Sequence, residues 1–120
     1  GDLVIQAFSR LLEQTVGPHH HAARIGGEEF AVLLPGTNLA AARMMAEGMR
    51  SAFSHADVDG VPAEARLTAS FGVAEAQPRE TAEELFRRAD NALYEAKRGG
   101  RDRVCLSLAP RDGRPEAISA

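Results

Sequence analysis

The chain has 120 residues and a net charge of -3; 44% of its residues are hydrophobic and 26% are charged. These values are ordinary for a soluble globular protein, and the length suits one domain with a modest core. The charge gives no reason to expect nucleic-acid or membrane-surface binding. No apolar run approaches the roughly 20 residues of a membrane span, and no signal peptide is visible. The single cysteine, Cys105, excludes an internal disulfide and fits a reducing cytoplasm.

The first predicted element is an amphipathic helix with Asp2 as its N-cap. The pair Gly17-Pro18 ends it near Val16. Three histidines follow, but adjacent side chains of an extended segment alternate between faces, so they do not predict a metal site. The apolar residues that recur at helical spacing are Leu3, Val4, Ala7, Phe8, Leu11 and Leu12.

Two strand-like runs, His21 to Ile25 and Phe30 to Leu34, are joined by Gly26-Gly27-Glu28-Glu29, a pattern that predicts a hairpin. Glycine at the tip permits positive φ and leaves space for a ligand to approach the backbone. The adjacent acids repel by roughly 4 kcal/mol at about 4 Å and an effective dielectric near 20, and a divalent cation would reverse that sign. A solvated acidic tip without a ligand is the alternative, and the spacing alone leaves both open.

The segment Pro35 to Asn38 reads as a turn that ends in an N-cap. A second helix follows and ends near His55, with Arg43 and Arg50 on its solvated face. The polar stretch Asp57 to Ala65 reads as a loop. The buried stripe of this helix is predicted to contain Leu39, Ala42, Met45, Ala46, Met49 and Phe53.

A strand is predicted over Arg66 to Glu75, where bulky apolar residues alternate with small ones that are expected to pack closely. Thr81 and Glu84 form a capping box for a third helix, which Gly99-Gly100 ends. A last strand covers Val104 to Leu108. Residues from Ala109 on are predicted to be a disordered tail. The core stripe of the third helix is predicted to contain Leu85, Phe86, Ala89, Leu93 and Ala96.

The pentapeptide Gly26-Gly27-Glu28-Glu29-Phe30 resembles the signature of GGDEF domains, the diguanylate cyclases, in the variant with Glu at its third position. Other matching segments follow the family order: Gly1-Asp2 at a helix start, Leu67 to Ala74, Ala89 to Lys97, and Gly100-Arg101. The resemblance implies an α+β, ferredoxin-like and nucleotidyl-cyclase-like fold with a mixed sheet and packed helices. It places the family's first strand before Gly1, so we expect a partial domain over 1–108 and a tail over 109–120.

The resemblance implies condensation of two GTP molecules into cyclic di-GMP, with release of pyrophosphate, by a homodimer that holds one GTP on each domain. The implied metal is Mg²⁺ or Mn²⁺, with Glu28 and Glu29 as metal ligands and catalytic residues, Glu28 also as a possible base. Gly26 and Gly27 would lie against the nucleotide. The remaining implied contacts are Lys97 and Arg101 to the triphosphate and Asp2 to guanine. Helix capping and the helix dipole are the structural alternatives for these last three residues.

Two departures from the family pattern matter. Gly17 and His20 stand at the Arg and Asp positions of the family's product-inhibition site, so we expect no such site. The family's other metal-binding acid and its guanine-binding asparagine belong with the first strand, so this chain alone is expected to be weakly active or inactive. The resemblance also implies an upstream sensory or receiver domain and a cytoplasmic location. The alternatives are a non-catalytic module that binds GTP or cyclic di-GMP, and a dimerising domain without a ligand.

Overall fold

The computed structural model describes residues 2–108, so the predicted tail over 109–120 lies outside the described part. The α+β composition is confirmed, and most boundaries fall within two residues of the predicted ones. Among the described residues, no helix combines the length and the apolar character needed to cross a membrane. The elements in chain order are α1 (Asp2–Thr15), β1 (His21–Arg24), β2 (Phe30–Leu33), α2 (Leu39–Ser54), β3 (Phe71–Ala74), α3 (Ala82–Arg98) and β4 (Val104–Ser107).

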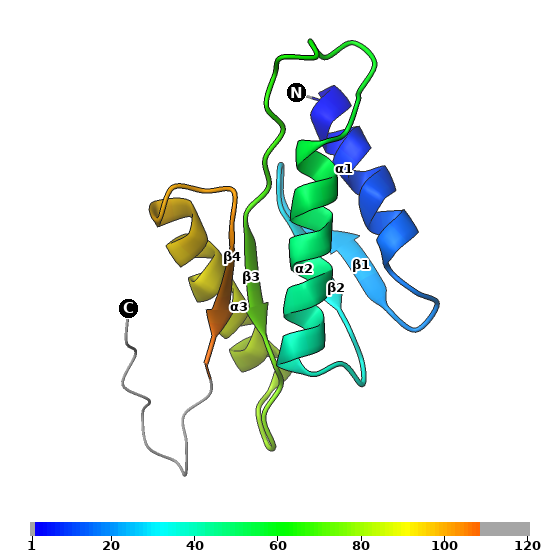
Figure 1. Cartoon of the computed structure of the whole chain (residues 1–120). Helices are drawn as coiled ribbons and strands as arrows, with labels where there is room; N and C mark the ends of the chain where they lie inside the picture. Colours follow the sequence, from blue (N-terminus) through cyan, green and yellow to red (C-terminus); the bar gives the residue numbers. More distant parts are fainter. Residues whose placement is uncertain (1, 109–120) are drawn as a thin grey trace.

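The strands form two separate pairs within residues 2–108, not one continuous sheet. Strands β1 and β2 are antiparallel, with Arg24 opposite Phe30. Strands β3 and β4 are parallel, with Phe71 opposite Val104, and α3 is the crossover that parallel pairing requires (Figure 1). Each of the four strands therefore has one edge without a strand partner in the described part of the chain.

Strand β3 is shorter than predicted and packs tightly on α3. Because β4 begins opposite Phe71, residues 66–70 have no neighbouring strand with which to form a ladder. The close packing expected of the small residues is confirmed at Gly72, where a Cβ would lie 2.2 Å from the Ala89 carbonyl oxygen and 2.3 Å from the Leu93 nitrogen. Gly72 thus lets the backbone of α3 lie directly against the strand.

Phe8 of α1 packs against the buried core cluster of Phe53, Val58 and Leu67 and joins elements from both strand pairs. Its ring centroid lies 5.2 Å from that of Phe53 in α2, 5.4 Å from that of Phe30 in β2 and 6.1 Å from that of Phe71 in β3. Val58 is also buried here, beside Phe53. It comes from the predicted polar loop, where a single apolar residue has no periodicity to reveal its burial.

The predicted caps define the starts of α2 and α3. The Asn38 side chain accepts a hydrogen bond from the Ala41 N–H at 2.8 Å. Thr81 and Glu84 form the reciprocal capping box that the sequence predicts. Helix α1 differs, because Asp2 is its first residue and lies within the first turn instead of capping it from outside.

Two predicted side-chain placements are wrong. Phe86 of α3 is 47% exposed, and the helix instead packs through small residues, with Ala92 and Ala96 buried. Arg50 of α2 is not on a solvated face; its side chain is only 26% exposed and is engaged in ion pairs. Small residues allow close approach to β3, so the contact face of α3 is rotated away from Phe86.

Candidate functional site

The acidic tip of the hairpin, residues 25–29, is held in shape by its own backbone and by Arg24. The Ile25 N–H donates to the Glu29 carbonyl at 2.9 Å and closes the loop. The Arg24 guanidinium folds over the tip and donates to the Gly26 carbonyl at 3.2 Å and to the Gly27 carbonyl at 2.6 Å. Sequence reasoning gave Arg24 no role, although a guanidinium beside a run of turn carbonyls is a suitable donor for them.

The two tip glycines are not required by the fold. Neither Gly26 nor Gly27 has the positive φ that glycine would permit, which among the described glycines occurs only at Gly36, Gly60 and Gly100. A Cβ at Gly27 would meet nothing within 4 Å, and one at Gly26 would make only ordinary contacts with Glu29, the nearest at 3.8 Å. Because neither conformation nor packing demands glycine, the uncovered backbone is available for a ligand to approach.

The structure brings together two of the predicted site residues, Glu29 at the tip and Lys97 in the last turn of α3. Glu29 Oε2 lies 3.3 Å from Lys97 Nζ, and the two side chains are 41% and 36% exposed. Such a solvated pair contributes at most about 1 kcal/mol to folding. Fold stability alone is therefore a weak reason for this contact.

The other predicted acids have different surroundings. Glu28 is exposed and has no ion-pair partner within residues 2–108, so the two adjacent acids do not share one environment. Asp2 is exposed in the first turn of α1, where the helix dipole favours a carboxylate. Figure 1 shows the start of α1, the hairpin tip and the end of α3 toward the same end of the molecule.

Arg101 lies in the loop between α3 and β4, in a conformation that residues with side chains rarely adopt. Gly100, Arg101 and Asp102 have φ values of 119°, 64° and 48°. Left-handed backbone costs a residue other than glycine about 1–2 kcal/mol. Arg101 is exposed and forms no ion pair in the described part of the chain.

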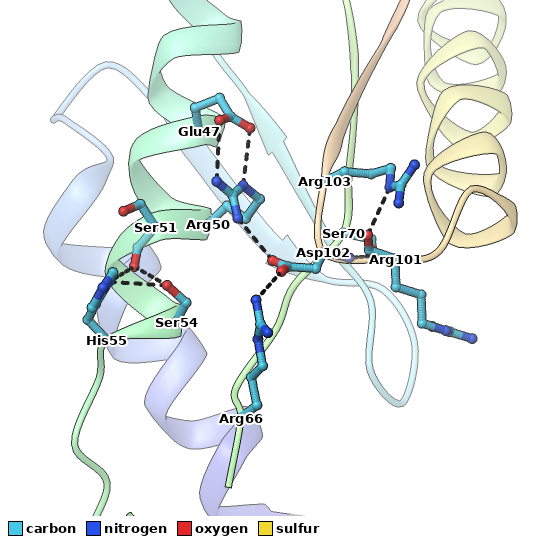
Figure 2. Close-up of polar contacts among 10 residues, drawn as sticks. All are labelled: Glu47, Arg50, Ser51, Ser54, His55, Arg66, Ser70, Arg101, Asp102 and Arg103. Atoms are coloured by element: carbon cyan, nitrogen blue, oxygen red, sulfur yellow. Dashed lines mark hydrogen bonds and ion pairs between the residues drawn. The ribbon is translucent and has the colours of Figure 1, made fainter. Parts of the chain in front are cut away.

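Asp102, the residue after Arg101, lies at the centre of a network of ion pairs that the sequence did not indicate (Figure 2). Asp102 Oδ1 lies 3.0 Å from Arg50 Nη1, and Oδ2 lies 3.2 Å from Arg66 Nη2. Arg50 also pairs with Glu47 at 3.2 Å. Its hydrogen bond to Glu47 raises the pKa of the guanidinium most, and its hydrogen bond to Asp102 raises this pKa further. These partners are 52 and 36 positions from Asp102, so no local pattern indicates them.

One cavity lies beside the Arg101 loop and another lies beside the hairpin. One, of about 390 Å³, is lined by Arg66, Thr68 and the loop Gly100 to Arg103. The other, of about 240 Å³, lies between α1 and the hairpin, with Ile5, Ser9, Ala23 and Phe30 among its lining residues. The first is rich in guanidinium groups, and the second shows that α1 does not fill the space beside β1.

The two tip acids fit a magnesium or manganese ion that arrives with phosphate groups. Their oxygens are the hard donors that these ions prefer, and Mg²⁺ usually takes one or two carboxylates together with substrate phosphates. Within residues 2–108, no group of three or more His, Cys, Asp or Glu side chains is gathered as a ready metal site. The donor set therefore suits a metal shared with a ligand, not one enclosed by protein.

The positions predicted to lack the inhibitory pair form a turn before β1. The Gly17 N–H donates to His20 Nδ1 at 2.9 Å, and the His20 N–H donates to the Gly17 carbonyl at 3.1 Å. These residues therefore have a local structural role. The expected lack of product inhibition stays a prediction.

An α+β arrangement with an acidic Gly-Gly hairpin beside a basic helix end defines a nucleotidyl-cyclase-like domain. The family profile described as "Diguanylate cyclase, GGDEF domain" matches residues 1–103. The chain belongs to the GGDEF family. The predicted family and fold class are therefore confirmed.

Individual relatives agree with this assignment. The chain is 43% identical over 104 residues to diguanylate cyclase DgcM of Escherichia coli K12. The matched region covers 87% of this chain and 25% of that protein. It therefore spans about a quarter of the length of that curated relative. The active GGEEF domain of a diguanylate cyclase from Vibrio cholerae has a TM-score of 0.81 at 30% identity, covering 90% of this chain and 69% of that one. The GGDEF domain of DgcB from Caulobacter crescentus, solved in complex with c-di-GMP, has a TM-score of 0.80 at 33% identity, covering 90% and 65%.

Proposed function

We propose that this chain is the cyclase domain of a diguanylate cyclase, which condenses two GTP molecules into cyclic di-GMP and releases pyrophosphate. The observation that carries the proposal is the 3.3 Å contact between Glu29 and Lys97. Phosphoryl transfer from a metal-bound triphosphate needs carboxylates for the cation and cations for the phosphates, side by side. The activity of the relatives named above supports the same reaction class.

Each predicted site residue takes a role in this proposal. Glu28 and Glu29 hold Mg²⁺ or Mn²⁺, and Glu28 also takes the proton from the attacking hydroxyl. The metal, when bound, polarises the phosphoryl group. Gly26 and Gly27 let the backbone lie against the nucleotide. Lys97 and Arg101 neutralise phosphate charge, and Asp2 contacts guanine.

The reaction joins two nucleotides, so it requires two domains that face each other. We therefore propose a homodimer in which each domain presents one GTP, controlled by an upstream sensory or receiver domain, in the cytoplasm. Residues 1–120 alone are expected to synthesise little product, because all four strands of the described part have an unpaired edge, which leaves backbone donors and acceptors without partners. Binding, not turnover, is thus the first property to measure.

The test is calorimetric titration of the chain with a non-hydrolysable GTP analogue and, separately, with cyclic di-GMP, each with and without Mg²⁺. Binding that depends on Mg²⁺ in the unmodified chain and is lost in the double variant Glu28→Ala, Glu29→Ala supports the proposal. The matched control is Glu64→Ala, which removes an exposed acid from the loop before β3 and should bind as the unmodified chain does.

Two outcomes would contradict it. Binding of cyclic di-GMP alone, insensitive to Mg²⁺, would indicate a product-sensing module. No heat with either ligand would show that residues 1–120 do not form a nucleotide site.

A further inference from the structure

We infer that Asp102 is a positioning residue for Arg101, because its carboxylate fixes the loop over 99–103 so that the Arg101 guanidinium is presented to the nucleotide triphosphate. This inference rests on the proposed function, in which Arg101 binds phosphate. It adds a residue that the resemblance did not assign.

The loop conformation is unusual and is held from several sides. Arg101 and Asp102 both have positive φ, 64° and 48°, directly after Gly100 at 119°. The Arg101 N–H donates to the Ala96 carbonyl at 2.9 Å, and the Asp102 N–H donates to Ser70 Oγ at 3.2 Å. An unfavourable backbone conformation persists only where its surroundings fix it, and such positions cluster at functional sites.

The Asp102 carboxylate adds a further restraint through its side chain. Each of its oxygens accepts from a different element, at 3.0 Å from Arg50 of α2 and at 3.2 Å from Arg66 of the segment before β3. The side chains of Asp102 and Arg50 are only 21% and 26% exposed, so solvent screens this pair less than a surface pair. Asp102 therefore ties the loop to two parts of the molecule that are remote in the sequence.

This arrangement leaves Arg101 available for a ligand. Figure 2 shows Asp102 turned toward Arg50 and Arg66, with the Arg101 side chain extending away from them. Arg50 and Arg66 thereby engage the carboxylate that lies next to Arg101 in the chain. Among residues 2–108, Arg101 has no ion-pair partner of its own, which suits a cation that receives phosphate.

The test is a double-mutant cycle between Asp102 and Arg101, read as affinity for the non-hydrolysable GTP analogue with Mg²⁺. Asp102→Gly removes the carboxylate without adding strain, since glycine adopts positive φ readily. We expect it to weaken binding about fivefold in the unmodified background and to cause no further loss beside Arg101→Gln. Asp102→Asn, which tolerates the left-handed conformation and keeps one acceptor oxygen, should recover part of the loss.

A merely structural role predicts a different result. The inference would be overturned if Asp102→Gly also lowered the affinity fivefold in the Arg101→Gln background. It would also be overturned if Asp102→Gly alone left the affinity unchanged. Thermal melting checks that the variants fold. If Asp102→Gly does not fold, Arg66→Gln takes its place in the same cycle, because it removes one of the two ion pairs of Asp102 from an exposed position. Absence of binding by the unmodified chain would instead overturn the proposed function, and this inference with it.

Discussion

Glu29 and Lys97, 68 positions apart in the sequence, meet at 3.3 Å between the tip of the β1–β2 hairpin and the last turn of α3. Within residues 2–108, this is the only side-chain hydrogen bond that links the hairpin to the rest of the molecule. It joins a proposed metal ligand to a proposed phosphate ligand. A metal-bound triphosphate would replace this ion pair with two contacts, one from Glu29 to the metal and one from Lys97 to a phosphate.

Lys97→Met should separate binding from stability. The half-exposed ion pair adds at most about 1 kcal/mol to folding, so the melting temperature should change little. A hydrogen bond to a charged phosphate is worth about 1.5–3 kcal/mol, so affinity for the GTP analogue should fall tenfold or more. Arg98→Met is the matched control, because Arg98 lies in the same helical turn but its guanidinium lies 5.8 Å from the centroid of the Tyr94 ring. An equal loss in both variants would show a general charge effect.

Gly72→Ala should destabilise the fold strongly. The added methyl would lie 2.2 Å from a backbone oxygen of α3, and backbone has little room to move. Overpacking costs about 1–3 kcal/mol, and this contact belongs at the upper end. Gly48→Ala is the contrasting control: it is exposed in α2 with nothing within 4 Å, and it should stabilise by about 0.5–1 kcal/mol. Urea denaturation of both variants measures the difference, and similar midpoints would contradict the packing of α3 on β3.

Glu80 should make stability depend on pH. Hydrogen bonds from the Arg88 guanidinium, at 2.6 and 2.7 Å, hold the pKa of Glu80 below its usual range, and the Gln77 N–H adds to this. A lowered pKa in the folded state stabilises the protein above the unfolded pKa. This stabilisation is lost as the pH falls below about 4.3, the pKa of glutamate in the unfolded chain, and then through the lower pKa of Glu80 in the folded protein.

Thermal melting of Glu80→Gln and the unmodified chain between pH 6 and pH 3 tests this. The variant should melt at a lower temperature at pH 6, and the difference should shrink toward pH 3. Glu64→Gln, in an exposed loop, should show no difference that depends on pH. A constant difference for Glu80→Gln at every pH would show that its charge is not the cause.

Arg24→Gln should loosen the acidic tip without unfolding the domain. The guanidinium donates to two tip carbonyls, at 3.2 and 2.6 Å, from an exposed position. Its loss should speed hydrogen exchange at the Ile25 amide, which closes the loop. Arg43→Gln, exposed on α2, should leave that exchange unchanged. Unaltered exchange in Arg24→Gln would mean that the backbone bond alone holds the tip.

Local signals in the sequence predicted most of the elements. The caps at Asn38 and Thr81 and the glycines after α3 act on neighbouring backbone, so their residue types reveal them. The site could be predicted only as a set of residues from the family pattern, because the meeting of Glu29 and Lys97 depends on the fold. The Arg50–Asp102–Arg66 network had no comparable signal. Phe86 was misplaced because helical spacing does not reveal that α3 meets β3 through its small residues.

The loose attachment of the hairpin has a consequence for ligand affinity. All four residues of β1 are exposed, and a cavity of about 240 Å³ lies between part of the hairpin and α1 beside the Phe8–Phe30 contact. Such a segment can open locally without unfolding of the whole domain. A nucleotide that bridges the tip and α3 must therefore restrict the hairpin's conformational freedom, and that entropic cost lowers its apparent affinity. Any partner or substitution that rigidifies the hairpin in advance would tighten nucleotide binding without adding a single contact.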